Sequence, residues 1–194
     1  MINKSRLSLV LLVAVFFGPF IVAWAVVNHG QQYLPLGQAA QGELILPSLS
    51  LAPFTLDSLT EESLDERVFS GRWTYVTVSG SSCGADCQQN LYKMRQVRLT
   101  QGKNIVRVQR LLILTDRDHL ADFQRVLSEH EGLKVVFDDE LNKEGIMTQL
   151  LKPHHDGIYV VDPLGNWFLQ YPKDADPSGM RKDLTKLLLN SQIG

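Results

Sequence analysis

Residues 73–87 read WTYVTVSGSSCGADC and contain the change of pattern that decides the fold. The first seven, residues 73–79, are rich in β-branched and aromatic side chains, which is typical of a β-strand. Residues 85–99 are mostly polar, with apolar side chains at helical spacing. The sequence therefore predicts a strand, a short turn and a helix. The only two cysteines of the chain, Cys83 and Cys87, lie near the start of that helix.

Residues 54–189 alternate between strand and helix patterns. We expect strands at 54–57, 108–115, 133–137, 157–161 and 166–171, and helices after Asp118, at 141–150 and at 178–189. Residues 162–165 (DPLG) predict a hairpin turn between the last two strands. The order β-α-β-α-β-α-β-β-α is that of an α/β protein with a thioredoxin-like three-layer sandwich.

The N-terminal part of the chain predicts a membrane anchor. Residues 7–27 contain no charged residue, and about 20 helical residues span a bilayer core. The alternative is a cleaved signal peptide, but its apolar region is only about 7–15 residues long. Lys4 and Arg6 precede the run and the next basic residue is Arg67, so the positive-inside rule places the N-terminus in the cytoplasm.

These observations predict a division of the chain into four parts. We expect a cytoplasmic stub at 1–6, a single transmembrane helix in the inner membrane at 7–28, a tether at 29–52 and a thioredoxin-like domain at 53–194. Residues 43–46 (ELIL) in the tether could form an edge strand. The domain would lie on the periplasmic side. The formal net charge of -2 argues against a nucleic-acid partner bound by phosphate neutralisation.

Cys83 and Cys87 are the first candidates for a functional site. They lie four residues apart, about one helical turn, so their sulfurs could form a disulfide or chelate one soft metal ion such as Cu(I). A helix N-terminus favours the thiolate form. The alternatives are a purely structural disulfide or two unrelated buried thiols. Gly84 and Asp86 indicate an exposed stretch, which argues against buried thiols.

Histidines are the natural third partner for such a pair, and the chain has five. His119 and His130 lie near the ends of a polar helix, where we expect them to be solvated. His154 and His155 precede the strand at 157–161. In a thioredoxin-like fold the loop that enters this strand lies against the turn that carries the cysteines, so His154 or His155 could be close to them.

Other acidic and aromatic residues have simpler interpretations. The segment 116–118 (DRD) predicts a helix cap, with Asp118 as the capping residue, in preference to a divalent-metal site. The segment 138–140 (DDE) predicts a solvated turn and helix start. Trp73 and Trp167 are expected in the core.

Several of these marks together resemble the Sco (SenC) family of copper-handling cytochrome c oxidase assembly proteins. They are the N-terminal anchor, residues 71–74 (GRWT), the C-x3-C pair, residues 90–94 (NLYKM), and His154 followed by residues 159–165 (YVVDPLG). The resemblance covers about residues 50–190. It implies that Cys83, Cys87 and His154 bind copper, with Cu(I) the expected state and His155 the second choice of ligand.

The sequence departs from the family pattern around the cysteines. Gly84 and Gln88 stand where the family usually has proline after each cysteine, and Asp86 lies one position later than the family's aspartate. These changes keep the sulfur donors but alter the groups that set copper affinity and reduction potential. We therefore interpret the chain as a divergent member.

Three functions follow as hypotheses. The first is a membrane-anchored copper chaperone, an assembly factor and not a metabolic enzyme, that helps to load the copper-binding subunit of a respiratory oxidase. The second is a membrane-tethered thiol–disulfide oxidoreductase acting on a client's cysteines, with Cys83 as the attacking and Cys87 as the resolving thiol. The third is an interaction module that keeps the fold without the chemistry.

Overall fold

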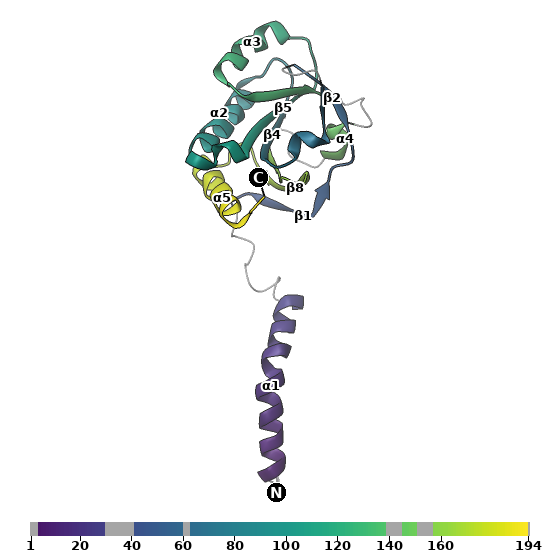
Figure 1. The fold of residues 1–194 in the computed structure, drawn as a ribbon, viewed down its shortest axis with the longest axis vertical. Coiled ribbons are helices and arrows are strands. Elements are labelled where there is room, and N and C mark those ends of the chain that lie inside the picture. The colour runs from purple at the N-terminus through teal and green to yellow at the C-terminus, as the bar shows by residue number, and fades with distance from the viewer. Residues whose placement is uncertain (1–3, 30–40, 60–62, 139–144, 151–156, 194) are drawn as a thin grey trace. The chain divides into compact units, whose positions relative to one another are not determined.

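The structure is a computed structural model that describes residues 4–29, 41–59, 63–138, 145–150 and 157–193. The chain divides into two units, Met1–Ala39 and Ala40–Gly194 (Figure 1). The first contains helix α1 (Lys4–His29), which has Pro19 in its interior and exposes apolar side chains such as Phe16 and Phe20. Among the residues described in full, no helix is both long and apolar enough to cross a membrane. The anchor at 7–28 stays a prediction.

Over the residues that the structure describes, the second unit is built on a mixed sheet of eight strands. Their order across the sheet is β1-β8-β7-β4-β5-β6-β2-β3. The strands are β1 (Glu43–Ser50), β2 (Thr55–Ser58), β3 (Ser63–Asp65), β4 (Trp73–Ser79), β5 (Val108–Leu114), β6 (Leu133–Phe137), β7 (Ile158–Val161) and β8 (Asn166–Tyr171). Strands β4, β5 and β6 are parallel to one another, whereas β7 runs antiparallel to β4.

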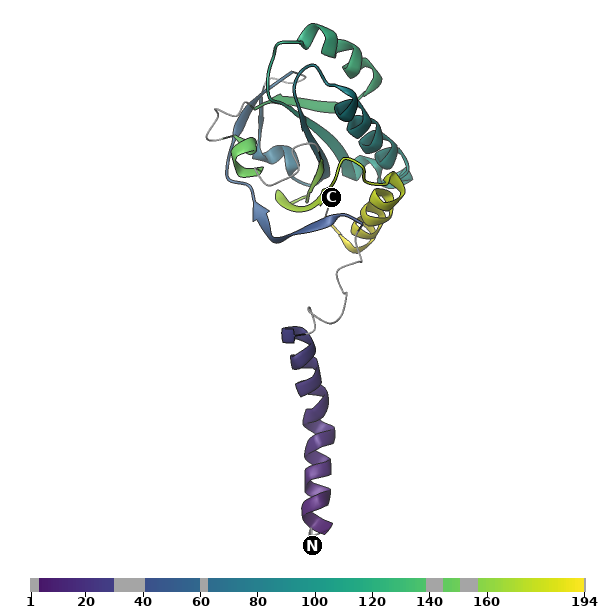
Figure 2. The same cartoon turned by 180° about the vertical axis from the view of Figure 1, so that it is seen from behind.

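Helices cover both faces of this sheet (Figures 1 and 2). They are α2 (Ala85–Leu99), α3 (Leu120–Glu129), α4 (Ile146–Leu150) and α5 (Pro177–Asn190), with 3-10 segments η3 (Glu66–Phe69) and η4 (Gly102–Arg107). Helices α2 and α5 lie side by side, and their buried Met94, Met180 and Leu184 pack with Tyr75 of β4. On the opposite face, Ile146 of α4 packs with Val76 and Leu111. The arrangement is the three-layer α/β sandwich that the alternating pattern predicts.

The predicted elements agree closely with those observed. The bounds of β4, α2, β6 and β8 match the predicted 73–79, 85–99, 133–137 and 166–171. The edge strand suggested at 43–46 is β1, which continues to Ser50 and pairs with β8, so the sheet takes in part of the segment assigned to the tether. The predicted helix at 141–150 is described only over α4, because residues 139–144 lie outside the described chain. Strand β3 and the 3-10 segments η3 and η4 were not predicted from the sequence.

Trp73 and Trp167 are both buried, as expected of core residues. The prediction that Asp138 lies in a solvated turn is wrong for its side chain, because Asp138 is only 1% exposed. Its carboxylate accepts a hydrogen bond of 2.7 Å from the backbone nitrogen of Met147 in the first turn of α4. A carboxylate near the start of a helix pairs with free N–H groups, which explains why this one is buried.

Candidate functional site

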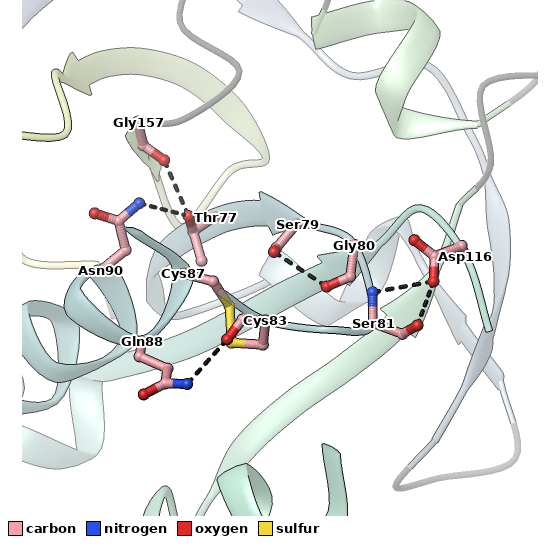
Figure 3. The surroundings of a disulfide bond; sticks show 10 residues. All are labelled: Thr77, Ser79, Gly80, Ser81, Cys83, Cys87, Gln88, Asn90, Asp116 and Gly157. Atoms are coloured by element: carbon pink, nitrogen blue, oxygen red, sulfur yellow. Dashed lines mark hydrogen bonds between the residues drawn. A yellow bond between two sulfur atoms is a disulfide. The ribbon is translucent and has the colours of Figure 1, made fainter. Parts of the chain in front are cut away.

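The cysteine pair lies in the connection between β4 and α2, where the sequence predicts it. Cys83 and Cys87 form a disulfide, with an S–S distance of 2.01 Å and Cα atoms 5.1 Å apart (Figure 3). Gly84 is the N-cap of α2, so Cys83 immediately precedes the helix and Cys87 lies in its first turn. Cys83 adopts a φ of 40°, which is uncommon for a residue other than glycine.

The disulfide is buried although the loop around it is exposed. Cys83 is 0% and Cys87 5% exposed, whereas Gly84 and Asp86 are exposed. The sulfurs pack against an apolar cluster that includes Phe123 of α3. The expectation of an exposed stretch is therefore wrong for the sulfurs, because both cysteines belong to a buried cluster with residues of β5, β6 and α3, which no local pattern reveals. A reagent or client must move this loop to reach either sulfur.

A carboxylate from the next connection holds the cysteine loop in place. Asp116 follows β5 and accepts hydrogen bonds from the backbone nitrogen of Ser81, at 3.1 Å, and from its hydroxyl (Figure 3). The Ser81 hydroxyl in turn accepts a hydrogen bond of 2.9 Å from the backbone nitrogen of His119. The bond from the Ser81 hydroxyl is the main reason why the pKa of Asp116 lies below its usual value. We call this arrangement the Asp116–Ser81 clamp.

The clamp corrects one sequence-based prediction. Asp118 does not cap α3, because the N-cap is His119 and it makes no side-chain capping bond. Asp116 is directed across to the cysteine loop instead. Gly80 permits this close approach, since a Cβ atom there would lie 2.7 Å from the Asp116 carboxylate. Ser81 and Asp116 are 35 residues apart, so no local motif could have predicted their contact.

A second set of bonds ties the start of β7 to the same end of the sheet. Thr77 of β4 donates a hydrogen bond of 3.0 Å to the carbonyl oxygen of Gly157 and accepts one of 3.2 Å from the Asn90 side chain (Figure 3). Thr77 also pairs with Ile158 in the antiparallel ladder. Because β7 is antiparallel to β4, β7 begins at the end of the sheet where β4 ends and the cysteine loop begins. No role in the site was assigned to Thr77 or to Asn90 from the sequence.

The predicted histidine ligands are outside the part of the chain that the structure describes. His154 and His155 fall in the segment 151–156, which precedes Gly157. Among the described residues, no group of three or more His, Cys, Asp or Glu side chains could hold a metal ion. The assignment of His154, or of His155, as the third ligand therefore stays a prediction.

The two histidines of helix α3 have different surroundings. His119 is exposed, as predicted. His130 is not solvated, since it is buried at the C-terminal end of the helix. Burial, followed by the positive charges of Arg110 and Arg95, lowers the pKa of His130. The sequence pattern missed this because the arginine that lies against it comes from β5.

Comparison with known protein families identifies the family of this chain. A family model described as "Transmembrane-like, thioredoxin-like, C-terminal domain" matches residues 73–191, more than half of the chain. The chain belongs to this family. The matched range contains both cysteines, the clamp and the start of β7. A search of curated protein sequences finds no match.

Solved structures of the same fold include copper-binding and redox proteins. Bradyrhizobium japonicum ScoI with copper bound has a TM-score of 0.58 and 19% identity, covering 71% of this chain and 99% of its own. Yeast Sco1 with copper bound has a TM-score of 0.61 and 20% identity, covering 74% and 91%. The thioredoxin domain of a thiol-disulfide oxidoreductase from Bacteroides vulgatus has a TM-score of 0.56 and 14% identity, covering 72% and 95%. The predicted resemblance to Sco proteins is confirmed at the level of the fold.

Proposed function

We propose that this family member is a copper carrier, with the Cys83–Cys87 pair as its carrying site. The observation that supports the proposal best is the placement of two bonded sulfurs, four residues apart, at the end of the sheet where β4 ends and β7 begins. Thiolate sulfurs are soft ligands that select Cu(I) over harder ions. Copper is the cargo of this site, and the protein's task is to hold it and release it.

The disulfide must open before copper can bind, because bonded sulfurs are not thiolate donors. Reduction of the Cys83–Cys87 bond takes two electrons and two protons, which a thiol reductant supplies. Binding of Cu(I) by the two thiolates then releases two protons, so copper affinity should rise with pH. The pair therefore links the redox state of the protein to its capacity for copper.

His154 is the proposed third ligand, with His155 as the second choice. The bond between Thr77 and Gly157 supports this assignment, because it fixes the chain three residues after His154 at the cysteine end of the sheet. An imidazole nitrogen complements two thiolates around Cu(I). We further propose that residues 7–28 anchor the protein in the inner membrane and that the domain works on the periplasmic side. Its client would be the copper-binding subunit of a respiratory oxidase.

Copper retention by the reduced full chain tests this proposal. We expect it to keep about one Cu(I) per chain against a Cu(I)-specific chelator, with retention lost in Cys83→Ser and Cys87→Ser. His154→Ala should weaken binding by about tenfold or more, and His155→Ala should weaken it less. His119→Ala is the matched control, because His119 is exposed and is not a proposed ligand. Unchanged copper stoichiometry in the two cysteine variants would exclude the carrier function.

The second candidate function is thiol–disulfide exchange with a client protein. The closed disulfide at the start of α2 favours it, since such a pair can accept electrons from a client's thiols. Cys83 would be attacked or attack first, and Cys87 would resolve the mixed disulfide. Equilibration of the pair with a glutathione buffer, read by thiol trapping, together with no copper retention, would favour this function over copper carriage.

A further inference from the structure

The end of the sheet opposite the cysteines contains a second candidate site. A cavity of about 420 Å³ lies between the C-terminal part of α2 and the turn that leads into β6. Its lining residues are Arg72, Arg98, Val108, Gln109, Gly132, Leu133 and Lys134. Val108 and Leu133 are the first residues of the parallel strands β5 and β6, whereas the cysteine loop follows the last residue of β4. The two sites therefore occupy opposite ends of the strands.

The lining of this cavity is strongly basic. It includes three cations, Arg72, Arg98 and Lys134, and no carboxylate is among its lining residues in the described chain. The Arg98 side chain is held in place, because its Nε donates a hydrogen bond of 2.7 Å to the carbonyl oxygen of Val108. Burial and then the charge of Arg72 lower the pKa of Arg98, so the two guanidinium groups are close enough to repel each other.

A buried arginine lies next to the wall of the cavity. Arg110 pairs with Leu133 in the sheet, and its Nη2 donates to the carbonyl oxygen of Glu131, the neighbour of Gly132. Arg110 is only 2% exposed, yet the Nε and Nη1 atoms of its side chain have no hydrogen-bond partner among the described residues. Buried guanidinium N–H groups without partners are costly and rare.

The charges around Arg110 add to this excess. Burial, then the charges of Arg98 and Arg95, lowers the pKa of Arg110 to about 10, so it remains a cation at neutral pH. Nearby, the charge of Glu129 raises the pKa of His130, but burial and the positive charges of Arg110 and Arg95 outweigh it. Positive charge thus converges from α2, from β5, from Lys134 of β6 and from Arg72 before β4, where an anion would offset the repulsion.

We propose that the cavity lined by Arg72, Arg98 and Lys134, with Arg110 beside it, binds a phosphate group. Guanidinium groups match phosphate oxygens through paired charge-assisted hydrogen bonds, and an anion offsets the repulsion among several cations. The inference goes beyond copper carriage and needs neither cysteine. Free phosphate and the phosphodiester of a lipid headgroup share this chemistry.

Titration calorimetry on the full chain tests the proposal, with inorganic phosphate and glycerophosphoglycerol as the two probes. Ionic strength is held constant with sodium chloride, because general screening would otherwise imitate binding. The test variant is the double change Arg72→Ala and Lys134→Ala. The control is Arg181→Ala with Lys182→Ala, which removes the same charge from an exposed part of α5.

The proposal predicts saturable phosphate binding in the wild type and in the control, weakened about tenfold or more in the test variant. Tighter binding of glycerophosphoglycerol would indicate a lipid headgroup as the ligand, and tighter binding of inorganic phosphate would indicate free phosphate. Equal affinity in the wild type and the test variant would overturn the proposal, as would no binding of either probe. Arg72→Gln alone, at an exposed side chain, keeps the test valid if the double variant unfolds.

Discussion

Removal of the Asp116 carboxylate should destabilise the domain through the cysteine loop. In Asp116→Ala, Ser81 loses the acceptor of both its backbone N–H and its hydroxyl, and Ser81 is 0% exposed. A hydrogen bond to a charged group contributes about 1.5–3 kcal/mol, and the partial exposure of Asp116 reduces this to about 1–1.5 kcal/mol for each bond. The expected loss is about 2–3 kcal/mol in the free energy of unfolding.

Thermal unfolding of the oxidised protein, followed by circular dichroism, measures this loss. For a domain of this size, about 2–3 kcal/mol corresponds to a fall in Tm of about 4–12 °C. Asp118→Ala is the matched control, since it removes the same charge from the same loop and keeps the backbone N–H that donates to Asp116. The variant's disulfide should also be reduced faster by dithiothreitol, because the loop that covers the buried sulfurs is released.

The pH dependence of this effect has a defined sign. The pKa of Asp116 is lowered in the folded domain, so the clamp contributes its full stability above the ordinary aspartate pKa of about 3.9. That contribution is lost as the pH falls through the folded pKa. The Tm difference between the wild type and Asp116→Ala should therefore be constant from about pH 5 to 8 and shrink below about pH 4. Equal Tm values for Asp116→Ala and Asp118→Ala at neutral pH would refute this reasoning.

Three further predictions concern other buried polar groups. Thr77→Val removes the hydroxyl that joins Asn90 to the start of β7. Chemical denaturation should show a loss of about 2–3 kcal/mol in the free energy of unfolding, and copper retention should weaken. Thr77→Ser should preserve both the stability and the copper retention. Asp183→Ala removes the acceptor of the Tyr171 hydroxyl and of two backbone N–H groups, and should lower the free energy of unfolding by about 3–5 kcal/mol. Asp174→Ala is the control, because Asp174 is exposed and its removal should leave the free energy of unfolding almost unchanged. Burial raises the pKa of Tyr75 and Tyr171, so an absorbance titration should show neither ionising before the domain unfolds, with stability falling as the pH rises past about 10.

The proposed functions share one mechanical requirement, which is that the cysteine loop must open. The disulfide is buried in an apolar cluster, and the Asp116–Ser81 clamp ties the loop to the connection that leads into α3. A copper donor, a reductant or a client thiol would meet the same barrier. Variants of the clamp should therefore change the rate of each reaction without removing a sulfur.

Local sequence patterns were sufficient to predict the elements that carry the site. The richness in β-branched and aromatic residues gave β4 its predicted bounds, and the helical spacing after Gly84 gave those of α2. Both patterns depend on neighbours within a few residues, so they can be recognised in the sequence without knowledge of the fold. The same locality allowed the two cysteines to be placed at the start of a helix and one turn apart.

Only the tertiary structure decided what surrounds those cysteines. The cysteines are buried in a cluster with distant residues of β5, β6 and α3, the clamp joins Ser81 to a residue 35 positions away, and Thr77 reaches Gly157 across 80 positions. Buried His130 and Arg110 likewise depend on the parallel pairing of β5 with β6. Strand order and layer packing bring distant segments together, and a periodic pattern carries no information about which distant segment will cover a given residue. The sequence alone therefore determined the elements and the cysteine spacing, while packing decided their access, their hydrogen bonds and their charge.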